Sequence, residues 1–291
     1  MPRLAGRPGF LVTPGGGCVL NLAPLGELAP QVMGSTDTSV ALADIAEPRG
    51  INERVVSMHS EWEVAMGEGA DEDDRVADLI ESQREFYDLR APDFGDETVP
   101  DRRVSGHMAS ELARALIDEF APTGDVLELA CGNGKFTREL VRHARTVTAI
   151  DGSPRMLERN RREVGDSSVT YVNADIFEWQ PDRRWDAVFF GFWLSHVPPV
   201  TFDEFWALVR SSLRTGGRVA FVDEDDRGTM NDDIHLVENV PVAPRTLRDG
   251  RRFDIVKVYW DPSELQDRVS ALGWQVAVRR VGETFLYGSA T

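Results

Sequence analysis

The pattern of apolar and polar positions changes sharply about a quarter of the way along the 291-residue chain. Residues 1–72 show no sustained helical or strand period and are rich in Gly, Pro and Ala. Such a segment buries too little apolar surface to offset the entropy lost when it is ordered. We therefore predict a disordered or poorly ordered extension over residues 1–72 and a folded domain over residues 73–291.

Two helices are predicted at the start of the folded part. Apolar residues recur at helical spacing after Arg75. The positions on this helical face are Val76, Leu79, Ile80, Phe86 and Tyr87. A second helix is predicted over about residues 105–120.

Short apolar strands then alternate with helices. Strands are expected over residues 125–129, 146–150, 169–173, 187–190 and 218–222, and helices over 135–143 and 154–162. Ser153 is suited to cap the second of these helices, with Pro154 at its first position. Alternating units of this length indicate an α/β fold with a doubly wound, mostly parallel sheet and helices on both faces.

The C-terminal part follows a different pattern. Residues 245–248 and 251–260 read as a β-hairpin, since Asp249-Gly250 supplies the positive φ of a tight turn. Asp261 and Glu264 form the pattern of a capping box, and Gly273 is expected to end the helix that follows. Residues 275–287 then return as strand.

Composition and charge exclude several classes of protein. The net charge of -17 repels phosphate backbones, which argues against a nucleic-acid partner. No apolar run of about 18 residues is present, so no membrane-spanning helix is expected. Pro14 and the three glycines after it interrupt an early apolar run, and we expect a cytoplasmic protein. Two cysteines make no disulfide framework, and no Cys/His cluster has metal-ligand spacing.

The turn Cys131–Gly134 is the most informative local motif. It joins a predicted strand to a predicted helix, and Gly132 and Gly134 let a ligand approach the backbone closely. The unpaired N–H groups at the start of the following helix add hydrogen-bond donors. This arrangement is typical of a nucleotide or nucleoside cofactor site.

Three acidic residues surround this turn in the predicted sheet. Glu128 precedes the turn and suits a cationic amino group. Asp151, nineteen residues after Gly132, ends the second strand, where a carboxylate can accept both hydroxyls of a ribose. Asp175 follows the third strand and suits an adenine amino group.

A nicotinamide-dependent oxidoreductase is the main competing interpretation of this site. Such an enzyme favours a third glycine under the cofactor pyrophosphate, but Thr137 occupies that position and bulky Phe136 precedes it. S-adenosylmethionine has no pyrophosphate, so it does not need that glycine. The motif and its context therefore favour a methyltransferase. A non-catalytic cofactor-binding protein is the third alternative.

These residues resemble the class I S-adenosylmethionine-dependent methyltransferases over about Glu81 to Ser289. The resemblance implies a Rossmann-like seven-stranded sheet, mostly parallel, with an antiparallel C-terminal strand. The stretch from Tyr87 to Ala91 looks like the helix–loop that closes over the cofactor in small-molecule members, so Tyr87 and Arg90 are expected to bind the cofactor.

Within that family, several segments are similar to the phosphonate O-methyltransferases of dehydrophos biosynthesis. These segments are residues 185–190, 193–194, 196–198, 246–247, 249–251, 255–258 and 271–274. The resemblance implies that His196, Arg245 and Lys257 line the pocket of an anionic substrate. A tyrosine of those enzymes has no aromatic counterpart in residues 97–101, so a different acceptor molecule is expected.

The general rule for open α/β sheets also places the acceptor beyond the carboxyl ends of the strands. The fourth predicted strand ends at Phe190, so Phe192, Trp193 and His196 should line that crevice, although core packing is an equal alternative for the two aromatic residues. An arginine fork and a lysine can hold the oxygens of a phosphonate or carboxylate.

The hairpin leaves the relation between the two cations open. With a two-residue turn, Arg245 faces Asp254 and strand alternation puts Lys257 on the other face. A bulge or a three-residue loop would bring both to one face. The alternative is that the basic residues of this region are solvated hairpin charges, namely Arg245, Arg248, Arg251, Arg252 and Lys257. Lys257 lies among apolar residues, where a lysine usually needs a partner.

We therefore expect S-adenosylmethionine-dependent methyl transfer to a small molecule, with O-methylation of a phosphonate or carboxylate as the leading reaction. His196 would then orient the acceptor oxygen. If the acceptor is a neutral hydroxyl or amine, His196 becomes the candidate general base. No metal, nucleic-acid or membrane partner is expected, and the protein is predicted to be a monomer or homodimer.

Overall fold

The computed structural model describes residues 70–94, 106–226, 233–282 and 284–291. Helix α2 (Ala70–Arg90) begins three residues before the predicted domain boundary at residue 73. The remainder of the predicted extension, residues 1–69, lies outside the described residues, and so does the stretch 97–101. The boundary between extension and folded domain therefore stays a prediction.

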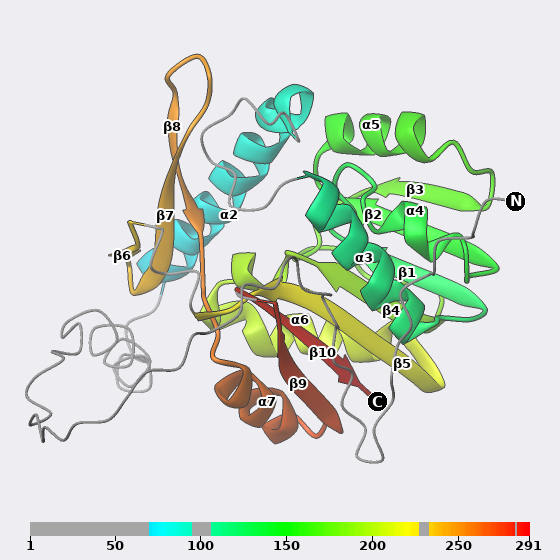
Figure 1. Ribbon diagram of the computed structural model, residues 1–291. Coiled ribbons are helices and arrows are strands. Elements are labelled where there is room, and N and C mark those ends of the chain that lie inside the picture. The colour runs from blue at the N-terminus through cyan, green and yellow to red at the C-terminus, as the bar shows by residue number, and fades with distance from the viewer. Residues whose placement is uncertain (1–69, 95–105, 227–232, 283) are drawn as a thin grey trace, which may run out of the picture. The chain divides into compact units, whose positions relative to one another are not determined.

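A seven-stranded sheet forms the centre of the fold, with the strand order β3-β2-β1-β4-β5-β10-β9 (Figure 1). The strands are β1 (Asp125–Leu129), β2 (Thr146–Asp151), β3 (Val169–Asn173), β4 (Trp185–Gly191), β5 (Leu213–Glu224), β9 (Val276–Val281) and β10 (Phe285–Ala290). The first five are parallel, and β10 runs antiparallel to both β5 and β9. The predicted doubly wound sheet with an antiparallel C-terminal strand is confirmed.

Helices cover both faces of this sheet and create two apolar cores. They are α3 (Gly106–Phe120), α4 (Thr137–Leu140), α5 (Pro154–Val164), α6 (Phe202–Ser211) and α7 (Pro262–Ala271). Helices α3, α4 and α5 share a core with one set of alternating strand residues, such as Val126 and Ala187. Helices α6 and α7 share the other core with residues such as Leu127 and Val188. Burial on both faces explains why the central strands are continuously apolar.

The predicted N-caps of α5 and α7 are confirmed, whereas the predicted lengths of α4 and of the last strand are wrong. Ser153 Oγ accepts a hydrogen bond from Met156 N at the start of α5, and Asp261 caps α7. Helix α4 is much shorter than the predicted 135–143, because the turn after the glycines continues to Phe136 and residues 141–143 also form a turn. The single strand predicted over residues 275–287 is wrong: Gly282, with φ of 61°, lies in the turn that separates β9 from β10.

A second, three-stranded sheet stands beside helix α2. It contains β6 (His235–Val237), β7 (Val240–Thr246) and β8 (Arg252–Val256) in that order. Figure 1 shows the long β7–β8 hairpin running alongside α2. The Phe86 and Phe253 rings pack 5.7 Å apart between them. The hairpin and α2 therefore form one wall above the edge of the main sheet.

The hairpin loop decides the relation between Arg245 and Lys257. Leu247 N donates to Arg251 O at 2.9 Å, which leaves a three-residue loop over residues 248–250. In this register Arg245 pairs with Phe253 rather than Asp254. Strand alternation then places Lys257 on the same face as Arg245. The three-residue alternative is the one that the structure adopts.

Candidate functional site

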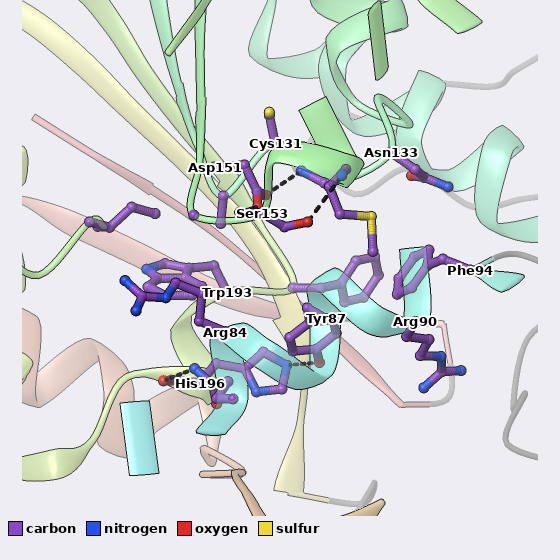
Figure 2. Close-up of a pocket in the computed structure, with 18 of the residues that line it drawn as sticks. Arg84, Tyr87, Arg90, Phe94, Cys131, Asn133, Asp151, Ser153, Trp193 and His196 are labelled. Carbon is purple, nitrogen blue, oxygen red and sulfur yellow. Dashed lines mark hydrogen bonds between the residues drawn. The ribbon is translucent and has the colours of Figure 1, made fainter. Parts of the chain in front are cut away.

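A cavity of about 320 Å³ opens at the carboxyl ends of β1 to β4, beneath α2 and the β7–β8 hairpin (Figure 2). Most of the residues predicted for the cofactor and the acceptor line this single cavity. They are Tyr87, Arg90, Gly132, Asp151, Asp175, Phe192, Trp193, His196, Arg245 and Lys257. Glu128 and Gly134 do not line it.

The glycine turn is held in place from below by Asn160 of α5. Asn160 Nδ2 donates to Gly132 O at 3.3 Å and to Thr137 Oγ1 at 2.8 Å. A Cβ atom at Gly134 would lie 2.6 Å from Asn160 Oδ1, and Gly134 has φ of 89°. Both steric space and backbone conformation therefore require glycine there, although Gly134 itself does not reach the cavity.

Glu128 lies behind the turn and not in the cavity, which corrects its predicted contact with a cofactor amino group. Its side chain is buried, and it accepts a hydrogen bond of 2.6 Å from Thr137 Oγ1. Burial raises the pKa of the Glu128 carboxyl to about 8. Thr137, at the position of the absent third glycine, therefore links Glu128 to Asn160 beneath the turn.

Asp151 presents a carboxylate to the cavity at the end of β2. Its two oxygens accept hydrogen bonds from Gly132 N and Ser153 N, each at 2.8 Å (Figure 2). Burial raises the pKa of Asp151 to about 6, against the lowering effect of these two backbone bonds. A carboxylate fixed in this way keeps lone pairs for two further donors, as a ribose diol requires.

Asp175 lies at another part of the same cavity, and Arg84 of α2 is its partner. Arg84 Nη1 lies 3.3 Å from Asp175 Oδ2. The Phe177 and Trp193 rings, 5.5 Å apart, form an aromatic wall of the cavity. Arg84 was not among the predicted site residues. Its spacing of three from Tyr87 on a predicted helix is the sequence signal that could have identified it.

Helix α2 places an aromatic and a basic residue of its last turn in the cavity. Figure 2 shows Tyr87 between His196 on one side and Phe94 and Arg90 on the other. The Arg90 guanidinium lies 5.5 Å from the centre of the Phe94 ring and 5.6 Å from that of Phe86. These contacts hold the cation against the cavity wall.

His196 is held by hydrogen bonds at both ring nitrogens. Nδ1 lies 2.7 Å from Val256 O, and Nε2 lies 2.9 Å from Tyr87 Oη. A carbonyl oxygen only accepts, so Nδ1 must carry a proton. In the neutral ring Nε2 then accepts from the Tyr87 hydroxyl. His196 lines the cavity, and its Nε2 atom is hydrogen-bonded there to the Tyr87 hydroxyl.

Lys257 is a buried cation with a defined partner. Its Nζ lies 2.7 Å from Glu224 Oε2 and 3.0 Å from Ser195 Oγ, and the side chain is 5% exposed. Burial by itself lowers the pKa of Lys257, but the carboxylates of Glu224 and Asp223 outweigh it, so the pKa lies above the usual range. Glu224 was not predicted, because its contact with Lys257 joins distant parts of the chain.

The loop after β4 takes a strained path along the cavity. Phe192 has φ of 57°, which is rarely adopted by residues other than glycine. A Cβ atom at the preceding Gly191 would lie 2.3 Å from the ring of Phe136. The Phe192 ring packs against Phe136 and Phe285 and also lines the cavity. Phe192 therefore both packs in the core and lines the cavity, so the two predicted alternatives hold together at this residue.

A metal-binding cluster and a membrane-spanning helix are both absent from the described residues. In that part of the chain no group of three or more His, Cys, Asp or Glu side chains could hold a metal ion. None of the described helices is both long enough and apolar enough to cross a membrane.

Comparisons with known proteins agree with this geometry. Residues 126–217 match the profile of the family described as "Methyltransferase domain". The solved DhpI–SAH complex is 43% identical, covers 73% of this chain and 96% of that chain, and has a TM-score of 0.62. The chain belongs to the class I S-adenosylmethionine-dependent methyltransferases. Its predicted fold, enzyme class and cofactor, S-adenosylmethionine, are confirmed, and the nicotinamide-dependent and non-catalytic alternatives are not supported.

More distant relatives share parts of this chain. An uncharacterized methyltransferase of Mycobacterium bovis, Mb0092, is 28% identical over 183 residues, which cover 60% of this chain and 89% of the relative. The Francisella tularensis 23S rRNA (uracil(1939)-C(5))-methyltransferase RlmD is 28% identical over 98 residues. That match spans 32% of this chain and only 22% of RlmD, so it reflects a shared part of the methyltransferase domain.

Proposed function

We propose that the enzyme methylates an oxygen of a small anionic acceptor, a phosphonate or a carboxylate. The observation that carries this proposal is the convergence of Arg245 and Lys257 on one face of the hairpin, where both line the cavity. An arginine fork can bind two oxygens of an anion, and a lysine contributes a point charge. The relative DhpI, solved as a complex with SAM and HEP, supports a second ligand beside the cofactor.

The cofactor is assigned to the half of the cavity nearest the glycine turn. Asp151 would accept the ribose hydroxyls, and Asp175 with Arg84 would lie at the adenine end. Gly132 lets the ligand approach the backbone, since no side chain occupies that space. Arg90 is a cation on the cavity wall and suits the carboxylate of the methionine part.

Tyr87 connects this half of the cavity to the acceptor half. Burial raises the pKa of its hydroxyl, while Lys257, Arg245 and Arg90 act in the opposite direction. All three cations therefore lie within electrostatic range of the Tyr87 hydroxyl. The acceptor half thus combines the Tyr87 hydroxyl with the cations Arg245 and Lys257, of which Lys257 is paired with Glu224, and the uncompensated positive charge favours an anion as its ligand.

The chemistry required of the protein is mainly alignment. When bound, S-adenosylmethionine supplies an electrophilic methyl group on a sulfonium. A phosphonate or carboxylate is ionised at neutral pH, so no side chain needs to remove a proton from it. Arg245 and Lys257 hold the oxygens that do not react, and the side chains of Phe192 and Trp193 exclude water.

Substitution of one hairpin arginine tests this assignment. Arg245→Gln should raise KM for ethylphosphonate or propionate about tenfold or more, because a charge-assisted bond to the anion is lost. Arg252→Gln is the matched control, since Arg252 lies on the same hairpin, is exposed and is not among the residues that line the cavity. Equal effects of the two substitutions, or turnover of neutral alcohols and amines only, would refute an anionic acceptor.

A further inference from the structure

The contact between Tyr87 and His196 has a consequence for the acceptor, provided that the proposed function holds. The protonated Nδ1 of His196 is committed to Val256 O, so only Nε2 changes its role with the charge of the ring. In the neutral ring Nε2 accepts the Tyr87 proton, and Tyr87 Oη turns lone pairs toward the cavity. In the charged ring Nε2 donates to Tyr87 Oη, and the hydroxyl proton is free to point into the cavity.

These two arrangements favour different ligands. Lone pairs on Tyr87 Oη repel an acceptor oxyanion, whereas the Tyr87 O–H donates to it. An oxyanion in contact with Tyr87 therefore stabilises the charged form of His196. A neutral hydroxyl acceptor would stabilise the neutral form, because it can donate to Tyr87 Oη.

We propose that Tyr87 contacts the reacting acceptor and that His196 acts through it, so that binding of an anionic acceptor takes up one proton. The proton comes from solvent through the cavity: Tyr87 passes its own proton to Nε2 and receives another at Oη. Tyr87 of α2 is thus assigned a contact with the acceptor, in addition to its expected contact with the cofactor. His196 is a positioning residue that sets the direction of the Tyr87 hydroxyl.

Charged groups from several elements surround this pair, including buried Asp223 of β5, which accepts a hydrogen bond from Ser195 N beside His196. The β7–β8 hairpin and the residues after it contribute Arg245 and Lys257, α2 contributes Arg90, and β5 contributes Glu224. Lys257 is compensated by Glu224 at 2.7 Å. A bound anion would add a negative charge beside Tyr87, and an added proton on His196 offsets that charge.

The experiment follows anion binding to the full-length protein saturated with S-adenosylhomocysteine, between about pH 6 and 9. Acetate and methanesulfonate are the probes, because they do not change charge over this range. Uptake of one proton predicts a dissociation constant that rises about tenfold per pH unit over the range in which the proton is taken up. Calorimetry in two buffers of different ionisation enthalpy, at a pH within that range, should count close to one proton per bound anion.

Two variants separate the relay from a merely structural contact. Tyr87→Phe should weaken the binding of the anion and remove the pH dependence of that binding, because the hydroxyl that carries the proton is gone. His196→Gln should retain binding with little pH dependence, since an amide N–H can donate permanently to Tyr87 Oη. Thermal unfolding of both variants serves as the check that they are folded.

The outcomes distinguish the relay from the proposed function. Anion binding without proton uptake, or uptake that persists in Tyr87→Phe, overturns the relay and leaves the anionic acceptor in place. If neither probe binds at concentrations up to about 100 mM, the affinity is weaker than that of a millimolar ligand. That result would refute the proposed anion pocket, and the relay together with it.

Discussion

Lys257 Nζ and Glu224 Oε2 lie 2.7 Å apart at the acceptor end of the cavity, so the most buried cation of this site carries its own counter-ion. The pair leaves Lys257 able to form further hydrogen bonds, because an ammonium has three donors. It also lowers the net positive charge that an acceptor meets. The acceptor site is therefore less cationic than Arg245 and Lys257 alone would make it.

Substitution of Lys257 and substitution of Glu224 should reduce the free energy of unfolding by different amounts. Lys257→Met removes the cation that lies 2.7 Å from Glu224 and also faces buried Asp223, and should reduce the free energy of unfolding by about 3 kcal/mol or more. Glu224→Gln should cost less, since Asp223 still faces Lys257. It should also lower KM for an anionic acceptor. Urea unfolding and steady-state kinetics measure the two effects, with Arg252→Gln as the surface control.

A smaller stability loss in Lys257→Met than in Glu224→Gln would contradict the buried pair. It would mean that the two carboxylates are already neutral in the folded enzyme. An unchanged or higher acceptor KM in Glu224→Gln would instead place Glu224 in contact with a donor group of the acceptor.

The glycine turn predicts a second result. Gly134→Ala forces a Cβ atom against Asn160 at a φ of 89°, and should displace the turn and weaken S-adenosylhomocysteine binding at least tenfold. Gly216→Ala is the matched control: its φ of 76° imposes comparable strain, but nothing lies within 4 Å of the added atom. That variant should lose about 1 kcal/mol of stability and keep its cofactor affinity. Calorimetry that finds equal affinity for the two variants would rule out a steric role of Asn160.

The pH dependence of cofactor binding follows from Asp151. Its pKa of about 6 in the free enzyme means that part of the population is protonated just below neutrality. Because the folded pKa is raised, this group stabilises the fold below about pH 4, its unfolded value, and that contribution is lost as pH rises through 6. A ribose diol prefers the ionised carboxylate, so cofactor affinity should increase from pH 5 to pH 7.

Titrations of S-adenosylhomocysteine at several pH values measure this increase. Asp151→Asn should bind more weakly at pH 7 and show a flatter profile, because the amide does not titrate. A wild-type affinity that is constant from pH 5 to 7 would indicate that the cofactor does not require the Asp151 carboxylate.

Much of the cofactor half of the site could be predicted from the sequence because it is local. Gly132, Asp151 and Asp175 each lie at or just after the carboxyl end of a strand, and parallel strands end at one common edge. The cap at Ser153 is equally local and is confirmed. Glu128 is the exception, because the periodicity of a buried strand does not show whether its polar residue faces the ligand or lies behind the turn.

The acceptor half depends on contacts between distant segments. The face shared by Arg245 and Lys257 is set by the Leu247–Arg251 hydrogen bond, which the dipeptide Asp249-Gly250 does not determine. The Tyr87–His196 contact spans 109 residues. Such contacts follow from the packing of α2 and the hairpin on the sheet edge, and single-sequence patterns do not encode them.

The most direct test of the proposed function is methyl transfer from isotopically labelled S-adenosylmethionine to a panel of small acceptors, with products identified by mass spectrometry and NMR. The panel should contain phosphonates, carboxylates, neutral alcohols and primary amines of similar size. The proposed function predicts label in the O-methyl esters of the phosphonates or carboxylates and none above background in the others. Label found in the ethers or N-methyl amines alone would contradict it.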